Sequence, residues 1–264
     1  MISFFRKIRI NLLSNGKLLT YLKYAVGEIL LVVIGILIAL QINNWNEKNK
    51  KSLLEQEALY NLKADFQLNN KELEFIIKRT ESSIDGIIEI LNHTGERNSD
   101  EFVLDTKILA AISAKTFNSQ DGFLNDLINS GNLGLLKSAK LRSMLSSWAP
   151  NLKEQARIEG YLEDSESKLV DFITKNGNWL NIDNLTPSFS NLNIPESGFD
   201  VSNNNMLASL EFENLVENCL IYHNNTLKNQ RKVLDLSREI LKLIQQEIDI
   251  NKSLISMLVH YPKL

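Results

Sequence analysis

One long apolar segment limits what this chain can fold into. Between Tyr24 and Ile42 the only charged residue is Glu28. Nineteen residues of α-helix are about 28 Å long, close to the roughly 30 Å hydrocarbon core of a bilayer. A helix that is apolar on all sides suits lipid better than a protein core, and the run lacks the small-residue cleavage site that follows a signal peptide. The sequence therefore predicts a transmembrane helix over residues 24–45.

The charges on either side of this helix predict its orientation. Five basic residues and no acid precede Glu28, and three lysines follow Trp45 closely. The basic residues are Arg6, Lys7, Arg9, Lys17 and Lys23 before the helix and Lys48, Lys50 and Lys51 after it. Because the more basic flank of a membrane helix stays in the cytoplasm, we expect residues 1–23 to form a basic cytoplasmic arm. Residues 46–264 are then expected on the opposite, periplasmic side of the membrane. A body retained in the cytoplasm is the alternative.

Aromatic and basic residues flank the helix where membrane interfaces favour them. Tyr21 and Tyr24 lie at one end and Trp45 at the other, as an aromatic belt requires. The arm interleaves apolar and basic side chains. These further anchors are Phe4, Phe5, Arg6, Lys7 and Arg9. This pattern is typical of an amphipathic segment on an anionic leaflet, and equally of the charged flank of an ordinary signal anchor. In both cases the lipid bilayer is a partner.

Glu28 shares one stripe of the helix with small and polar residues. At about 100° per residue, Gly35 and Ala39 lie about 20° to either side of it, and Asn46 lies in line with it. Small residues four apart allow helices to approach closely in lipid. We expect the stripe Glu28, Gly35, Ala39 and Asn46 to mediate a homo-oligomer or a contact with another membrane protein. The alternatives are a Glu28 that reaches the headgroups or pairs with Lys23, and a proton or ion relay.

The remaining chain has helical periodicity and no alternating strand pattern. The fold class is therefore all-α: one transmembrane helix continues into an antiparallel helical bundle with one long irregular loop. The expected elements are a first helix that runs on to residues 92–95, a second over Phe102–Lys115, and a short third one capped by Ser119 and ended by Gly131. A longer helix starts after Ser138 and ends at Asn176-Gly177, the irregular loop covers about 177–205, and the last helix runs from about Met206 to Val259.

Motifs for catalysis or metal binding are absent from the sequence. His93, His223 and His260 stand alone, without HExxH, paired cysteines or a carboxylate at ligand spacing. The lone Cys219 has the setting of a small apolar core residue, and no nucleophile or phosphate-loop motif occurs. We therefore predict no catalytic, cofactor or metal site. The net charge of −3 argues against a nucleic-acid partner.

Two sequence blocks resemble a known family. The first block is carried by Phe4–Arg9, Tyr24, Gly27, Glu28, Gly35–Leu40 and Asn43–Glu47, and the second by LNDLINSG, LR and LSSW between Leu124 and Trp148. They resemble a large family of uncharacterised single-span bacterial membrane proteins, known only as a domain of unknown function and abundant in Gram-negative envelopes of the Bacteroidetes type. The resemblance implies a membrane-anchored helical protein and brings no known activity.

These observations favour a non-enzymatic protein of the inner membrane with a periplasmic helical body. We expect it to act through protein–protein interaction, as a scaffold, adaptor or subunit of a membrane assembly. The alternative is a ligand-sensing periplasmic bundle, which would need a partner subunit because few residues precede the helix. A third hypothesis is a hydrolase, whose sign would be a convergent cluster of buried carboxylates or histidines.

Overall fold

The computed structural model describes residues 18–97, 101–186, 189 and 191–260. These residues form helices and connecting turns, without strands. The chain divides into two compact units, Met1–Glu57 and Ala58–Leu264, and helix α2 contributes to both. The predicted anchors Phe4, Phe5, Arg6, Lys7 and Arg9 lie outside the described residues, as do the side chains of Tyr21 and Tyr24.

Helix α2, Leu18–Leu91, is one uninterrupted helix of 74 residues. The prediction that the apolar helix runs on into the body is confirmed, and the helix ends directly before residues 92–95, as expected. Two features end it. The hydroxyl of Thr94 donates to the Leu91 carbonyl, and Gly95 adopts a φ of 63°, a backbone conformation that glycine tolerates best.

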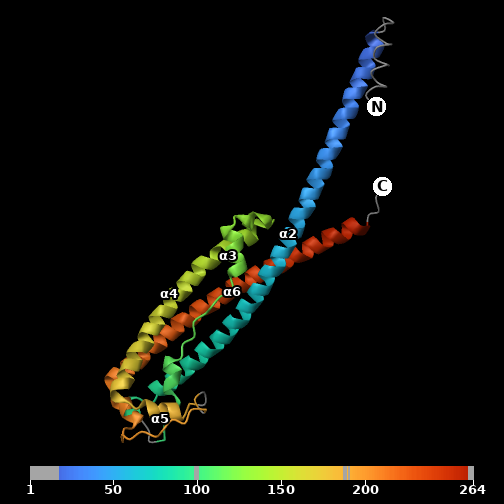
Figure 1. The fold of residues 1–264 in the computed structure, drawn as a ribbon. Coiled ribbons are helices and arrows are strands. Elements are labelled where there is room, and N and C mark those ends of the chain that lie inside the picture. Colours follow the sequence, from blue (N-terminus) through green and yellow to red (C-terminus); the bar gives the residue numbers. More distant parts are fainter. Residues whose placement is uncertain (1–17, 98–100, 187–188, 190, 261–264) are drawn as a thin grey trace. The chain divides into compact units, whose positions relative to one another are not determined.

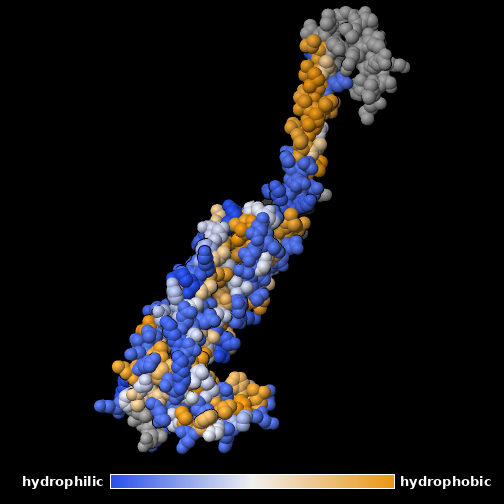
Figure 2. All heavy atoms as spheres, turned by 60° about the vertical axis from the view of Figure 1, so that its left-hand side comes forward, coloured by the Kyte–Doolittle hydropathy of each residue, from blue (hydrophilic) through white to orange (hydrophobic). Residues whose placement is uncertain are grey.

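In the first unit, the apolar part of α2 buries almost nothing within the chain. It is the one helix among the described residues that is long and apolar enough to cross a membrane, and none of its apolar window is buried. Figure 2 shows apolar side chains along this stretch. A core helix of a soluble protein also meets the length and composition criteria, but such a helix would be covered by other parts of its chain.

The second unit is built on three long helices: the second part of α2, α4 (Ala139–Asn176) and α6 (Leu210–His260). Figure 1 shows them alongside one another. Arg231 of α6 pairs with Glu81 of α2 at 2.7 Å, and Arg238 with Glu74 at 2.8 Å, so these helices run antiparallel. Helices α4 and α6 are also antiparallel, because Gln155 bonds to Asn229 and Ser165 contacts Cys219.

Several boundaries follow the local signals in the sequence. The Ser138 hydroxyl accepts a hydrogen bond from the Leu141 N–H and caps α4, as predicted, and α4 ends at Asn176 before Gly177. Short helix α3, Gly122–Asn129, is followed by Gly131 with a φ of 71°. The predicted cap of α3 was wrong: the cap residue is Asp121, not Ser119, and its side chain makes no capping bond.

The predicted α-helix over Phe102–Lys115 was also wrong. This stretch forms two 3₁₀ segments, η2 (Leu104–Thr106) and η3 (Ile108–Ile112), and then an extended connector over residues 113–121 that leads to α3. The Asn204 side chain accepts from the Leu104 N–H and donates to the Phe102 carbonyl. The Asn204 amide thereby satisfies the Phe102 carbonyl, which an α-helix would have paired internally, and the Leu104 N–H, which the first turn of a helix would have left unpaired. The apolar spacing alone misled the prediction.

The segment predicted as an irregular loop, 177–205, contains more structure than expected. It includes helix α5 (Trp179–Asn184) and the start of 3₁₀ segment η6 (Asn203–Ala208), and α6 begins at Leu210 rather than near Met206. Asn203 is almost fully buried and joins the two ends of the loop. Its side chain accepts from the Asn178 N–H at 2.6 Å, donates to the Asn178 carbonyl at 3.0 Å and donates to Asp105.

The core of the second unit has two apolar halves. One half lies around Leu59–Ile77 of α2, Leu141–Trp148 of α4 and Leu227–Ile248 of α6. The other lies around Ile87–Ile90, Leu169–Ile173 and Phe212–Cys219 of the same helices. Between the halves, and reaching into the first of them at Gln230 of α6, interior positions carry polar side chains. This zone is the candidate functional site.

Candidate functional site

A polar layer crosses the interior of the body between the two apolar halves. We define it by its buried members and one half-buried residue, Glu166 of α4. The buried members are Thr80 and Ser83 of α2, Gln155, Glu159 and Ser165 of α4, and His223, Thr226 and Gln230 of α6. A seven-residue spacing explains how they enter the core. Trp148, Leu162 and Leu169 are buried on one face of α4, and Gln155 occupies the position between Trp148 and Leu162.

One half of the layer is a chain of hydrogen bonds that begins on α6. The Asn229 amide donates to the Gln155 side-chain oxygen at 2.6 Å. The Gln155 amide donates to Glu159 at 2.5 Å, and the Phe117 backbone N–H donates to the same carboxyl oxygen at 3.2 Å. Burial raises the pKa of Glu159, and these two donors oppose the rise. The chain thereby links α6, α4 and the extended connector.

The other half of the layer is built around Glu166 and His223. The Ala114 N–H of the connector donates to Glu166 Oε1 at 2.9 Å, and His223 Nε2 lies 3.5 Å from the same oxygen. The Nδ1 of His223 is 2.9 Å from the Cys219 carbonyl. A carbonyl can only accept, so Nδ1 carries the proton and the neutral ring presents Nε2 to Glu166 as an acceptor.

Burial sets the charge of this pair. It raises the pKa of Glu166 to about 7, with a further rise from the nearby Glu163 and a partial opposition from the Ala114 N–H. Burial also lowers the pKa of His223. A protonated Glu166 can donate to His223 Nε2, so the pair is neutral when Glu166 holds its proton and carries one buried negative charge when the proton leaves.

The layer does not have the arrangement of a nucleophilic catalytic site. Burial raises the pKa of the Cys219 thiol to about 11, so this sulfur stays protonated near neutral pH. Its polar contact is the Ser165 hydroxyl at 3.5 Å, and both ring nitrogens of His223 face other groups. Within the described ranges, no cluster of three or more His, Cys, Asp or Glu side chains could hold a metal ion.

Several buried atoms of the layer lack a hydrogen-bond partner within the described part of the chain. They are His223 Nε2, the Thr226 hydroxyl and both side-chain amide atoms of Gln230, whose side chain is fully buried. An unsatisfied buried polar group costs about 1–3 kcal/mol, so an apolar layer at this place would make the fold more stable. The polar layer is therefore a candidate for function rather than for stability.

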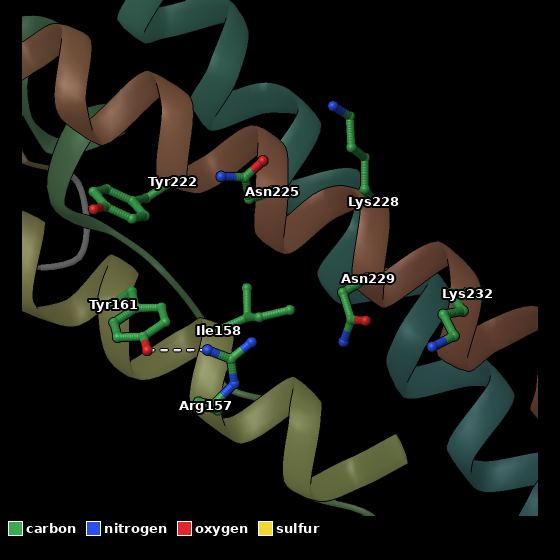
Figure 3. Close-up of a pocket in the computed structure, with 8 residues that line it drawn as sticks. All are labelled: Arg157, Ile158, Tyr161, Tyr222, Asn225, Lys228, Asn229 and Lys232. Atoms are coloured by element: carbon green, nitrogen blue, oxygen red, sulfur yellow. Dashed lines mark hydrogen bonds between the residues drawn. The ribbon is translucent and has the colours of Figure 1, made fainter. Parts of the chain in front are cut away.

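A groove on the surface lies directly over this layer, between α4 and α6. It has a volume of about 440 Å³, and Figure 3 shows its lining. The lining residues are Arg157, Ile158 and Tyr161 of α4 and Tyr222, Asn225, Lys228, Asn229 and Lys232 of α6. A smaller hollow of about 150 Å³ adjoins it and shares Tyr161 and Tyr222.

Contacts within the groove hold its α4 side in place. Arg157 donates to both carboxyl oxygens of Glu154 at 2.7 and 2.9 Å. It also donates to the Tyr161 hydroxyl at 3.0 Å (Figure 3). Asn229 lines the groove and is also the first donor of the buried chain that passes through Gln155 to Glu159. The groove surface and the polar layer are therefore one connected hydrogen-bonded structure.

The residues predicted for membrane-helix contacts lie elsewhere. Glu28, Gly35, Ala39 and Asn46 are all on α2 and exposed within the chain, at spacings of seven and four residues that keep them on one helix face. Trp45 is 66% exposed. These residues belong to the first unit, and their roles remain predictions.

Sequence reasoning missed the polar layer. It treated His223 as standing alone, whereas the Glu166 carboxylate lies beside it from another helix. The sequence signal that could have revealed the layer is a set of polar residues at positions of the helical repeat that face neighbouring helices. These are Gln155 and Glu159 on α4 and Thr226 and Gln230 on α6.

Fold and site together define the class: in its described residues, an all-helical protein with one helix long and apolar enough to cross a membrane, and a helical body whose apolar core contains a polar layer. Residues 28–186, more than half of the chain, match the model of a family of unknown function, DUF6090. The chain belongs to this family. No curated protein and no solved structure gives a significant match.

Proposed function

We propose that the chain is a single-pass protein of the inner membrane, with a cytoplasmic N-terminus and an antiparallel helical bundle in the periplasm. In this proposal it acts without catalysis, as a scaffold, adaptor or subunit of a membrane assembly. The positive-inside pattern of the sequence supports the orientation.

One observation carries this proposal: the apolar part of α2 is uncovered by the chain itself. Twelve large apolar side chains between Val26 and Ile42 are each 44–72% exposed. Complete burial of one such side chain is worth roughly 1.5–3 kcal/mol, and soluble monomers rarely expose a continuous apolar surface of this extent. Lipid, or lipid together with partner helices, is the environment that covers all sides of such a helix.

The stripe on α2 predicts how the protein assembles in the membrane. Gly35→Ile or Ala39→Ile places a branched side chain where helix backbones would approach, so each change should lower the oligomer mass of the full chain in mild detergent. Light scattering and crosslinking measure this. The matched control is Gly27→Ile, which adds the same side chain about 100° away from Glu28. An unchanged mass in both stripe variants would exclude the stripe as the contact.

A second candidate function is a ligand-sensing bundle that signals through a partner subunit. The groove between α4 and α6 favours it, because the hydrogen-bonded chain under Asn229 couples the groove to the connector. This role requires a stoichiometric membrane partner, which mass spectrometry of the natively purified protein would detect. A pure homo-oligomer would favour the scaffold instead.

A further inference from the structure

We propose that the α4–α6 groove binds an elongated organic anion, with a ring held at the end formed by Tyr161 and Tyr222 and a carboxylate or phosphate group held at Lys228 and Lys232. This inference rests on the second candidate function, the ligand-binding role, and names the chemistry of its ligand. It is carried by the shape, the charge and the ring geometry of the groove.

The size of the groove suits a small molecule. Its volume of about 440 Å³ lies within the roughly 300–1,000 Å³ of typical ligand sites. The adjoining hollow of about 150 Å³ extends it past the two tyrosines. Only one aliphatic side chain, Ile158, lines the main groove, and the rest of its lining is aromatic, amide or basic. The rings and the carbon chains of the long side chains make most of the exposed lining apolar, so a ligand that combines a ring with an anionic group matches it.

The charge of the groove is positive at the end away from the tyrosines. Lys228 and Lys232 are one helical turn apart on α6, both are exposed, and neither forms an ion pair with another described residue. The third cation, Arg157, is already paired with Glu154. Glu154 also lies close enough to Lys232 to be influenced by its charge. The two lysines are therefore the groups left to receive an anion. Figure 3 shows Lys232 extending toward α4 and Lys228 extending away from it, so the flexible Lys228 side chain has to turn to reach a bound anion.

The ring end is formed by two facing tyrosines. The ring centroids of Tyr161 and Tyr222 are 6.4 Å apart, with 44° between the ring planes. Tyrosine contributes an apolar face and a hydroxyl, which suits a sugar or a nucleobase. Arg157 lies over Tyr161, 5.2 Å from its centroid, so Tyr222 offers the freer ring surface.

The distance between the two ends sets the length of the ligand. At 1.5 Å per residue, Lys228 lies about 9 Å along α6 from Tyr222, and Lys232 about 15 Å. A free inorganic anion can contact the lysines but cannot also reach the tyrosines. Asn225 lies between the two ends and can both donate and accept a hydrogen bond, as Figure 3 shows by its position in the groove.

The test uses the full chain in non-ionic detergent and isothermal titration calorimetry. The probes are the acidic trisaccharide trigalacturonate with its neutral trimethyl ester, adenosine diphosphate with adenosine, and inorganic phosphate. We expect one of the two ring-bearing anions to bind, with its neutral counterpart and phosphate alone at least about tenfold weaker. The anion that binds identifies the ligand as a saccharide acid or a nucleotide.

Variants then locate the site. Lys228→Gln together with Lys232→Gln, and separately Tyr222→Leu, should each weaken binding of that anion by about tenfold or more. Lys242→Gln, on the same helix but outside the groove, should leave the affinity within about twofold. Thermal unfolding by circular dichroism, unchanged within about 3 °C, shows that a variant is folded.

Three results would overturn the inference: no binding of either anion up to about 10 mM, phosphate binding as tightly as the ring-bearing anions, or an equal loss of affinity in Lys242→Gln. Oligomer mass is measured on the same sample by light scattering. A sample that forms oligomers without binding either anion would refute the proposed ligand and leave the scaffold proposal standing. A sample that binds one of the anions without forming oligomers would support the ligand and refute the homo-oligomeric scaffold.

Discussion

Glu166 is a side chain in the body whose charge state depends directly on the fold. Its carboxyl lies between the Ala114 N–H of the connector and His223 and Cys219 of α6, with Glu163 nearby on α4. Burial raises its pKa from 4.5 to about 7. The folded chain therefore keeps a proton that the unfolded chain releases above about pH 4.5. This contribution to stability is complete below that pH and is lost as the pH rises through about 7.

Glu166→Gln should remove this pH dependence. Glutamine is close in shape to the protonated carboxyl and cannot ionise, and its side-chain oxygen can occupy the Oε1 position that accepts from the Ala114 N–H. A pKa rise of this size corresponds to about 3 kcal/mol of unfolding free energy lost when Glu166 ionises in the folded chain. Partial solvent screening reduces this cost, so we expect the variant to be more stable than the wild type at pH 8 by about 1–2 kcal/mol.

The check is chemical denaturation of both proteins between pH 5 and 8. The difference in unfolding free energy should shrink as the pH falls toward 5, because wild-type Glu166 then holds its proton. His223 lowers stability below its unfolded pKa of about 6.5 in both proteins, so its effect largely cancels in the difference. A difference that stays constant with pH would show that Glu166 does not titrate in this range.

At the scale of elements, one close approach joins α2 to segment η3. A Cβ atom added at Gly86 would lie 2.5 Å from the Ala110 Cβ, a separation that packed atoms do not adopt. The glycine thus allows α2 and η3 to meet over a core that includes Ile87, Ile90 and Ile108. It does so although glycine weakens a helix interior by about 1 kcal/mol relative to alanine.

Gly86→Ala should therefore destabilise the body by about 1–2 kcal/mol, despite the better helix propensity of alanine, because α2 and η3 must separate. The double variant Gly86→Ala with Ala110→Gly keeps one methyl group in the contact, now on α2 instead of η3, and should restore most of the lost stability. Gly160→Ala is the matched control: it lies within α4, nothing is within 4 Å of the added atom, and it should be stabilising by about 0.5–1 kcal/mol. Equal effects of Gly86→Ala and Gly160→Ala on denaturation midpoints would refute the close contact.

At the scale of the whole molecule, the two units differ in what covers their apolar surface. The first unit exposes its apolar side chains, whereas the second buries large residues such as Trp148, Phe66 and Phe212 in its own core. Trp148 packs against Phe66 and Phe117 with ring centroids 5.0 and 6.4 Å apart. This packing does not need the apolar part of α2.

A chain that begins at Ser52 should therefore be soluble and folded. We expect it in the supernatant after ultracentrifugation without detergent, with a helical circular dichroism spectrum and a single cooperative unfolding transition. The full chain should remain in the membrane pellet after a carbonate wash. As a matched control, Ile34→Arg with Leu37→Arg keeps the length and should release part of the full chain, since each arginine costs about 2.5–3.5 kcal/mol at the centre of a membrane helix. A shortened chain that still pellets would place the membrane contact in the body.

The sequence by itself determined the features that depend on neighbouring residues. The unbroken α2, the cap at Ser138 and the helix ends before Gly95 and Gly177 all follow from signals within one turn of helix. The uniform lack of charge between Ile29 and Ile42 likewise needs no tertiary information to suggest a membrane helix.

Only the tertiary structure decided the path of residues 102–121 and the chemistry of the polar layer. The partners there are far apart in sequence: Asn204 bonds to the backbone at Leu104, Gln155 to Asn229, and Glu166 lies beside His223. Periodicity places a polar residue on a buried face but cannot say which distant group will meet it. Because an interior donor or acceptor must find a partner wherever the packed helices provide one, the groove and its layer exist only once α2, α4 and α6 have come together.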